Sequence, residues 1–387
     1  MEKSLSPIQA VEAAEGAYLM RDSRDLTDAW IASPHLRDMF DIKGGVRLSG
    51  VTGGAFVHPL SGFGYMAQGT GGRKGECLIA VRGTVLTDVF DLVTDARFGG
   101  TIGPSGYWVD VGFWTTAKSL LPSITEQLQR IRPKALHIVG HSLGGGVATL
   151  LADAIASGNA RYAPRLYTFG SPRCGCEEHS RYLTQRLGAS NIYRVYHDND
   201  PVAMVPIFPY LPVPYASNAY RLKGQGLLLS FAGHLMAGYA KSVEGCTWSS
   251  LPVIPPELGS FEAAAAWLKQ AADGSDWRVV KGSAKLLALI LSSLDWILKK
   301  LGQSVGVLAF AGATVMDGLA RLLYSGVLLS VRINESVRNL LMAAMKFMGL
   351  RLPPAVNLSV AVIQYVLDRL HQYVVSMARR VLNAGVV

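Results

Sequence analysis

The sequence predicts an α/β fold with a mostly parallel central sheet, followed by an all-helical C-terminal domain. Up to about residue 245, short apolar runs typical of buried strands alternate with helical stretches. The proline-rich segment SLPVIPPELGS at 250–260 then interrupts the pattern. Beyond it, the hydrophobic period is helical only. We therefore expect a first domain over residues 1–250 and a helical domain over residues 258–387.

The first domain carries its helix and strand signals in alternation. Ser6-Pro7 is a favourable N-cap and first-turn pair, so a helix is expected over 6–22. Glycine-rich turns separate the β-like runs of 45–84, and the last run, ECLIAVRGT, has the continuous apolar character of a buried central strand. The later expected elements are a helix at 115–132, a strand at 136–139, a helix at 143–157, a strand at 165–169, a helix at 177–187, a strand at 192–196 and a helix at 234–244.

The helical domain differs from the rest of the chain in charge. Residues 277–387 contain 13 Lys or Arg against 4 Asp or Glu, a balance of +9 that equals the net charge of the whole chain. A basic, apolar helical region favours an anionic membrane surface or an acidic protein partner. A bundle with a solvated Lys/Arg face is the alternative. Nucleic acid is not expected as a partner, because the basic residues are scattered among aliphatic ones without a reader motif.

The most apolar stretch of this domain, 302–331, is expected to form a buried or interfacial hairpin. Its longest charge-free run, Gly302–Met316, has 15 residues, whereas a helix that spans a membrane needs about 20. Within 355–384, polar residues recur at spacings of three, four and seven, which places them on one face of a helix. His371 belongs to that face, so we expect it to be exposed to solvent.

The cysteines and the N-terminus bear on metal binding and location. Four cysteines are too few for a disulfide scaffold in 387 residues, and Cys174-x-Cys176 lacks the second pair or histidine cluster of a metal site. We expect neither a metal nor a cofactor. The polar first 16 residues contain no apolar core, so no cleavable signal peptide is expected. The protein would be cytosolic or would leave its cell by a route without a cleaved signal.

A serine between glycines is the candidate nucleophile. Residues 140–144 read GHSLG, the G-x-S-x-G form of a nucleophile elbow between a strand and a helix. Gly140 and Gly144 permit the tight turn, and Ser142 lies at its apex. Such a serine requires a general base, an acid that orients the base and an oxyanion hole.

The candidate acid and base follow Ser142 along the chain. Asp198 and Asp200 end a predicted strand, and Asp200 is favoured because the proline after it imposes an extended backbone at a loop edge. His234 follows the acid in order and lies within the first domain, at the expected start of a helix. His197 is adjacent to the acid in sequence, so we expect it to point elsewhere.

An oxyanion hole needs backbone N–H groups aimed at the developing negative charge. One is expected at Leu143, directly after the nucleophile. The other should follow an earlier strand, where the ECLIAVRGT run ends in Thr84. The Thr84 hydroxyl would act as a further donor beside its own amide.

Together these segments resemble, in the correct order, the motifs of the class 3 (fungal-type) lipases, a family with the α/β-hydrolase fold. The matching segments are VRGT at 81–84, GF at 112–113, GHSLGG at 140–145, TFGSPR at 168–173, DPV at 200–202 and His234. The resemblance covers about residues 45–245. It implies that Ser142, Asp200 and His234 form the triad, that Thr84 and Leu143 form the oxyanion hole, and that residues 86–108 are the lid.

The sequence departs from the family pattern at three places. Asp110 stands where many relatives have histidine, Gly146 stands where alanine is usual, and the Cys174/Cys176 pair replaces the usual neighbours of GSPR. None of these departures removes a predicted catalytic group.

We therefore expect hydrolysis of lipid carboxyl esters through an acyl-enzyme, with phospholipase A or lipase activity at membranes that the basic helices bind. The chain also resembles bacterial lipase effectors, including those delivered by type VI secretion. That resemblance implies a toxin that is cytoplasmic in its producer and is delivered to the periplasm or membrane of a target cell. It also implies a cognate immunity or chaperone protein as a partner.

Two other functions are compatible with the sequence. One is a soluble esterase or triglyceride lipase whose helical domain only caps the site or forms an oligomer. The other is a non-catalytic pseudo-hydrolase scaffold or a membrane-permeabilising protein. The complete set of acid, base and nucleophile argues against the scaffold, which needs none of them.

Overall fold

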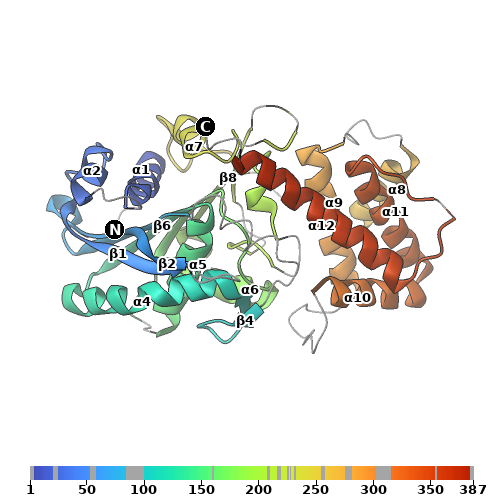
Figure 1. Cartoon of the computed structure of the whole chain (residues 1–387), viewed down its shortest axis with the longest axis horizontal. Coiled ribbons are helices and arrows are strands. Elements are labelled where there is room, and N and C mark those ends of the chain that lie inside the picture. The colour runs from blue at the N-terminus through green and yellow to red at the C-terminus, as the bar shows by residue number, and fades with distance from the viewer. Residues whose placement is uncertain are drawn as a thin grey trace.

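The computed structural model shows an α/β part followed by a helical part, and the two lie side by side along the long axis of the molecule (Figure 1). Residues 4–383 are described except 21–24, 53–57, 84–99, 159–160, 207–209, 216–218, 225, 227, 231, 254–257, 275–280, 302–314 and 354. The predicted fold class is confirmed, because a mostly parallel sheet precedes a set of helices. The domain limits at 250 and 258 stay a prediction.

One seven-stranded sheet forms the centre of the α/β part, in the order β1-β2-β3-β6-β7-β8-β9. The antiparallel strands are β1 (Phe40–Thr52), β2 (His58–Gly69) and β3 (Glu76–Val81). The strands parallel to β3 are β6 (Ala135–His141), β7 (Arg165–Phe169), β8 (Ile192–His197) and β9 (Tyr220–Leu222). Every residue of β3 and β6 is buried, as expected for central parallel strands.

Two apolar clusters cover the two faces of the sheet, because successive side chains of a strand point to opposite faces. In β3, Leu78 belongs to one cluster and Ile79 to the other. The cluster of Ile79 includes α4 (Val111–Ile131), α5 (Leu143–Gly158) and α6 (Glu177–Leu187), and it continues into the helical part. The cluster of Leu78 includes α1 (Pro7–Tyr18), α2 (Leu26–Ile31) and α7 (Met236–Val243).

The parallel strands bring the sequence motifs to one edge of the sheet. β3, β6, β7 and β8 run in the same direction, so their carboxyl ends meet there. The register pairs Val81 with Gly140, and His141 with Phe169. The polar segments after these strands, including the serine turn and the HDNDP segment at 197–201, are therefore neighbours in space.

One helix begins earlier than predicted because a side chain caps its N-terminus. α4 begins at Val111, ahead of the predicted start at residue 115, because the Asp110 carboxylate accepts the N–H groups of the next turn at 2.9 and 3.0 Å. Burial raises the pKa of Asp110 to about 6, although both hydrogen bonds act to lower it. Aspartate therefore has a capping function at the position where many class 3 lipases have histidine.

The predicted lid, 86–108, is described from residue 100 onward. There β4 (Gly100–Ile102) and β5 (Trp108–Asp110) form a separate antiparallel pair. Ser105, in their connecting turn, donates a hydrogen bond at 2.8 Å to Asp153 of α5, a fully buried residue that also contacts His179 of α6 at 3.2 Å. These polar contacts fix the end of the predicted lid to the helices beneath it.

The helical part begins after the proline-rich segment. Its described helices are α8 (Phe261–Asp273), α9 (Ala284–Lys300), α10 (Val315–Leu329), α11 (Val331–Phe347) and α12 (Val360–Asn383). Serine caps start three of them, at Ser260, Ser283 and Ser330.

The sequence predicted the last helix, α12, within 355–384, and it did not single out α8. Of the hairpin expected at 302–331, residues 315–329 form α10 and residues 302–314 lie outside the described chain. Within the described part, no helix combines the length and the apolar character that crossing a membrane requires.

The prediction that His371 is exposed is wrong, because it is only 3% exposed on α12. α12 packs against both α10 and α11, so part of its polar face is covered. On the same face, Gln364 donates a hydrogen bond to Asp317 of α10. Burial lowers the pKa of His371 from 6.5 to about 4. Helical spacing showed which residues share a face, but not which neighbour covers it.

The buried His371 is expected to make stability depend on pH. Its pKa is lower in the folded chain, so between about pH 6.5 and pH 4 only the unfolded chain binds this proton, and the free energy of unfolding falls as the pH falls. The full slope is about 1.4 kcal/mol per pH unit. In His371→Gln, the loss of Tm between neutral pH and the acid end of this range should be smaller than in wild type, as measured by circular dichroism. Parallel Tm curves for the two proteins would contradict this expectation.

Candidate active site

The predicted nucleophile lies in a strained turn between β6 and α5. Ser142 has a φ of +57°, in the left-handed region that non-glycine residues rarely adopt. A Cβ on Gly140 would lie 2.2 Å from the Gly144 carbonyl oxygen, and one on Gly144 would lie 2.5 Å from the Arg82 carbonyl carbon. Both glycines are therefore required for the chain to turn this tightly beside the end of β3.

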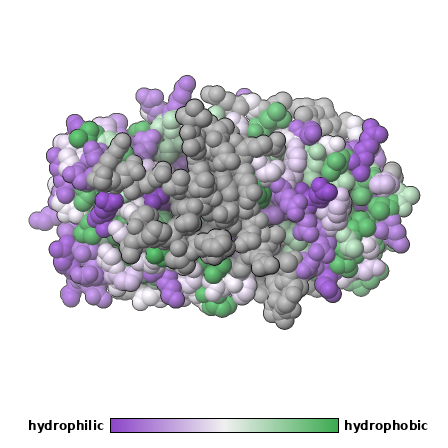
Figure 2. All heavy atoms as spheres, viewed as in Figure 1, coloured by the Kyte–Doolittle hydropathy of each residue, from purple (hydrophilic) through white to green (hydrophobic). Residues whose placement is uncertain are grey.

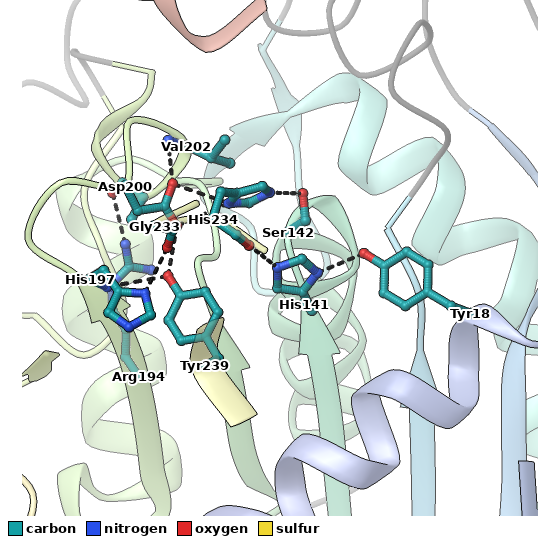
Figure 3. Close-up of polar contacts among 11 residues, drawn as sticks. Tyr18, His141, Ser142, Arg194, His197, Asp200, Val202, Gly233, His234 and Tyr239 are labelled. Carbon is teal, nitrogen blue, oxygen red and sulfur yellow. Dashed lines mark hydrogen bonds and ion pairs between the residues drawn. The ribbon is translucent and has the colours of Figure 1, made fainter. Parts of the chain in front are cut away.

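The structure brings the predicted nucleophile, base and acid into one hydrogen-bonded line (Figure 3). Ser142 Oγ lies 2.9 Å from His234 Nε2, and His234 Nδ1 lies 3.0 and 3.1 Å from the two oxygens of Asp200. An ionised Asp200 can only accept, so Nδ1 donates to it and Nε2 is left to accept the serine proton. This tautomer is the one that a general base for serine requires.

The acid is held ionised by the groups around it. Tyr239 Oη donates to Asp200 at 2.7 Å, and the Val202 N–H donates at 2.8 Å. Burial acts to raise the pKa of Asp200, but the charge of His234 and the hydrogen bonds from His234, Tyr239 and Val202 outweigh it and lower the pKa. The competing acid, Asp198, instead accepts the Gly224 N–H at 2.8 Å and so stabilises a turn.

Gly170, in the TFGSPR segment, leaves room for the acid–base pair. It follows β7 with a φ of +53°, and a Cβ there would lie 2.6 Å from Asp200 Oδ2 and 3.0 Å from His234 Nδ1. No side chain fits at this position without displacing the carboxylate or the imidazole.

Gly170→Ala is therefore expected to lower kcat by at least about 10-fold, because even a small displacement of a catalytic pair is costly. Gly188→Ala is a matched control, since Gly188 also has a positive φ, +80°, but its Cβ would meet nothing closer than 3.7 Å. Both variants should lose stability, by about 1 kcal/mol or more. Only Gly170→Ala should lose activity, and equal rates of ester hydrolysis in the two variants would contradict the geometric argument.

Two residues that the sequence did not single out position the backbone of the base. His141 Nε2 lies 2.8 Å from the His234 carbonyl oxygen, and His141 Nδ1 lies 2.7 Å from Tyr18 Oη (Figure 3). A carbonyl can only accept, so Nε2 donates and Nδ1 accepts from the Tyr18 hydroxyl. Burial, with the charge of His234, lowers the pKa of His141 to about 3, so the ring stays neutral. Through this chain of hydrogen bonds, α1 holds the loop of the base.

His197 holds the same loop from the other side. Its Nδ1 donates to the Gly233 carbonyl oxygen at 2.7 Å, and its Nε2 lies 2.9 Å from Ser242 Oγ. Its ring stacks on Tyr239 with centroids 4.3 Å apart. The sequence predicted that His197 points away from the catalytic acid, and its hydrogen bonds go to Gly233 and Ser242, so that it supports the residue before His234.

One half of the predicted oxyanion hole falls within the described residues. Leu143 is the first residue of α5, where backbone N–H groups have no partner within the helix and the helix dipole is positive. Thr84 lies outside the described residues, although β3 leads directly to it.

The cysteines near the site are packing groups. Burial raises the pKa of Cys174 to about 12 and that of Cys176 to about 11, so both are protonated thiols at neutral pH. Among the described residues, no group of three or more His, Cys, Asp or Glu side chains is placed to hold a metal ion.

Comparison with known families supports the geometry. Residues 78–210 match the family model described as lipase (class 3), and this segment includes Ser142 and Asp200. Residues 78–210 are therefore similar to the class 3 lipases. The matched segment ends before His234, and the hydrogen bond to Ser142 connects this base to it.

The chain is also similar to named proteins, among them two fungal lipases and a bacterial toxin. Secreted mono- and diacylglycerol lipase 1 of Fusarium solani is 32% identical over 170 residues, which are 42% of this chain and 49% of that protein. Secreted mono- and diacylglycerol lipase A of Penicillium cyclopium is 30% identical over 193 residues, 48% of this chain and 60% of that protein. Toxin TseL of Vibrio cholerae is 31% identical over 114 residues, 30% of this chain and 16% of the toxin. The chain therefore spans about half of the fungal enzymes and a small part of the toxin.

Proposed function

We propose that this protein is a serine carboxyl-ester hydrolase that acts on lipids at membranes. The observation that carries the proposal is the hydrogen-bonded line from Ser142 through His234 to the buried Asp200. Ser142 and Asp200 lie in the segment that matches the class 3 lipases, and the fungal relatives are named as lipases of mono- and diacylglycerols.

The geometry supports acyl transfer in two steps. His234 Nε2 takes the Ser142 proton as Oγ attacks the ester carbonyl, and the Leu143 N–H stabilises the resulting oxyanion. His234 then protonates the leaving alcohol, and water releases the acyl group by the same route. Asp200 stays ionised and stabilises the positively charged imidazole that forms between the steps.

The nucleophile and the base are both buried. Ser142 is only 5% exposed and His234 only 2%. Buried active sites commonly open through loops or segments around them. A lipid surface is the environment in which we propose that the opening occurs.

The proposed substrates are phospholipids, cleaved as by a phospholipase A, with acylglycerols as the second choice. The basic C-terminal region supports phospholipid as the preferred substrate, because its net charge of +9 favours binding to anionic headgroups. The test is mass spectrometry of vesicles that contain phospholipid and diacylglycerol, incubated with the wild type or Ser142→Ala. Release of lysophospholipid by the wild type alone supports the proposal. If fatty acid is released from diacylglycerol alone, or if only soluble esters are hydrolysed, the phospholipase proposal is wrong. The protein would then be the soluble esterase or triglyceride lipase.

An antibacterial effector role is a further part of the proposal, supported by the likeness to a protein named as a toxin. We infer that the protein is cytoplasmic in its producer, acts in the periplasm or membrane of a target cell, and is neutralised by an immunity protein. Expression with a periplasmic targeting signal should arrest growth, and Ser142→Ala should relieve the arrest. Equal toxicity of Ser142→Ala would favour membrane disruption by the helical region instead.

A further inference from the structure

The corner between α10 and α11 exposes an unusual amount of aliphatic surface. Leu328 is 69% exposed, Leu329 80% and Val331 79%. These values exceed those of all other large hydrophobic residues in the described chain, the next of which is Ile31 at 60%. Single exposed aliphatic residues are ordinary, but a contiguous group marks a surface that binds a protein or a membrane. We call Leu328, Leu329 and Val331 the aliphatic corner.

The aliphatic corner is held rigidly by the helices that form it. Ser330, between the two helices, donates its N–H to Gly326 at 3.1 Å and caps α11 by accepting the Ile333 N–H. The helices also approach closely, because a Cβ on Gly326 would lie 2.6 Å from Leu301 and 2.9 Å from Ile333. The exposure is therefore a property of the packed fold, and not of a frayed helix end.

Cationic side chains lie at the base of the aliphatic corner. Arg332 directly follows it, and its side chain is 57% exposed. The Arg332 guanidinium and the Lys300 ammonium lie 5.3 and 5.7 Å from the centre of the same Phe261 ring, which is buried. Arg332 also lies 3.8 Å from Glu262, an exposed pair that contributes little and that a competing phosphate can replace.

An aliphatic tip with cations at its base is the arrangement of an interfacial membrane anchor. Apolar side chains enter the acyl boundary, while the long Lys and Arg side chains reach the headgroups above it. Figure 2 shows hydrophobic and hydrophilic residues side by side over the end of the molecule that the helical part forms. The +9 balance of residues 277–387 adds attraction for anionic lipid.

We propose that the aliphatic corner inserts into a bilayer that contains anionic lipid, with Lys300 and Arg332 on the headgroups. This rests on the proposed function, because a lipid hydrolase must stay at the surface where its substrate lies. The anchor belongs to the helical part, outside the segment that matches the class 3 lipases. It therefore assigns the helical part a role in holding the enzyme at the membrane.

The test uses the full chain and ether-linked lipids, which an esterase cannot hydrolyse. Co-sedimentation is measured with vesicles of ether-linked phosphatidylcholine and phosphatidylglycerol. Leu328→Ser/Leu329→Ser/Val331→Ser should weaken partitioning at least about 10-fold, because three aliphatic side chains no longer enter the acyl region. Ile31→Ser is the matched control, an exposed aliphatic residue on α2, and should bind like the wild type.

The charges are tested separately. Lys300→Gln/Arg332→Gln should lose about 5-fold or more in affinity for the anionic vesicles and should bind vesicles of pure phosphatidylcholine as the wild type does. Added salt should weaken the binding of wild type more than that of this variant.

The outcomes distinguish this inference from the proposed function. Hydrolysis of the soluble ester p-nitrophenyl butyrate and the Tm should match the wild type in the corner variant, which shows that it is folded. If the corner variant binds the vesicles as well as the wild type does, the proposed anchor is wrong. The anchor is also wrong if the wild type hydrolyses the soluble ester but does not bind the vesicles. Absence of ester hydrolysis with corner-dependent binding instead overturns the proposed function and leaves the anchor standing.

Discussion

Ser142→Ala is expected to lower kcat/KM for a soluble ester by about 10⁴- to 10⁶-fold, because no other described atom occupies the nucleophile position beside His234 Nε2. The fold should persist. Alanine keeps the Cβ at the strained φ of +57°, and it removes only the hydroxyl, which contacts the base. The measurements are the kinetics of p-nitrophenyl butyrate hydrolysis and the Tm of both proteins.

A fluorophosphonate probe tests the same assignment without turnover, since it labels only an activated serine. Wild type should be labelled and Ser142→Ala should not. Ser171→Ala is a suitable control, because Ser171 is also buried near the turn, but its hydroxyl donates to the Pro172 carbonyl oxygen and not to a base. Labelling of Ser142→Ala, or loss of labelling in Ser171→Ala, would be inconsistent with Ser142 as the nucleophile.

The sequence predicted the edge of the sheet well, for a physical reason. Central parallel strands are continuous apolar runs, so their ends are visible where the first polar or glycine residue appears. Ser142 follows such a run and Asp200 follows the predicted strand at 192–196, and parallel pairing then brings both to one edge. His234 follows no strand and was found by its order in the chain, a weaker signal that needed the family resemblance.

The support for the base could not be predicted in the same way. His141 contacts His234 across 93 residues of sequence, and Tyr18 contacts His141 across 123. Contacts at such separations arise from tertiary packing, and neither periodicity nor turn chemistry shows them. Within the GHSLG segment, His141 reads as the variable position of the motif, although its two ring nitrogens connect α1 to the loop of the base.

In the helical part, the sequence indicated elements better than surfaces. The spacing of polar residues predicted the amphipathic helix α12, but it assigned His371 to solvent, whereas this residue is buried in the packed fold. Leu328 and Leu329 belong to the apolar stretch that is expected to form a buried or interfacial hairpin, and their strong exposure excludes only the buried alternative for these two residues. Which side of a helix is covered depends on its neighbours, and these come from the tertiary fold.

Asp200→Asn is expected to lower kcat by about 10⁴-fold with little change in fold, because the amide selects the wrong tautomer of the base. Asp200 accepts hydrogen bonds from His234, Tyr239 and the Val202 N–H. An asparagine has one acceptor oxygen and an NH₂ donor. When its oxygen keeps the backbone bond, its NH₂ faces His234 Nδ1 and donates to it, so the ring proton moves to Nε2. The base then cannot accept the Ser142 proton.

Asp198→Asn is the matched control, since it makes the same chemical change two positions away in the same turn. The Asp198 carboxylate accepts the Gly224 N–H at 2.8 Å, and an asparagine oxygen can accept that bond equally well. Its kcat should stay within a few-fold of wild type. The rate of fluorophosphonate labelling should fall with kcat in Asp200→Asn and not in Asp198→Asn. If Asp198→Asn instead loses the activity, the acid of this triad has been assigned to the wrong residue, and the orientation of His234 must depend on a different hydrogen bond.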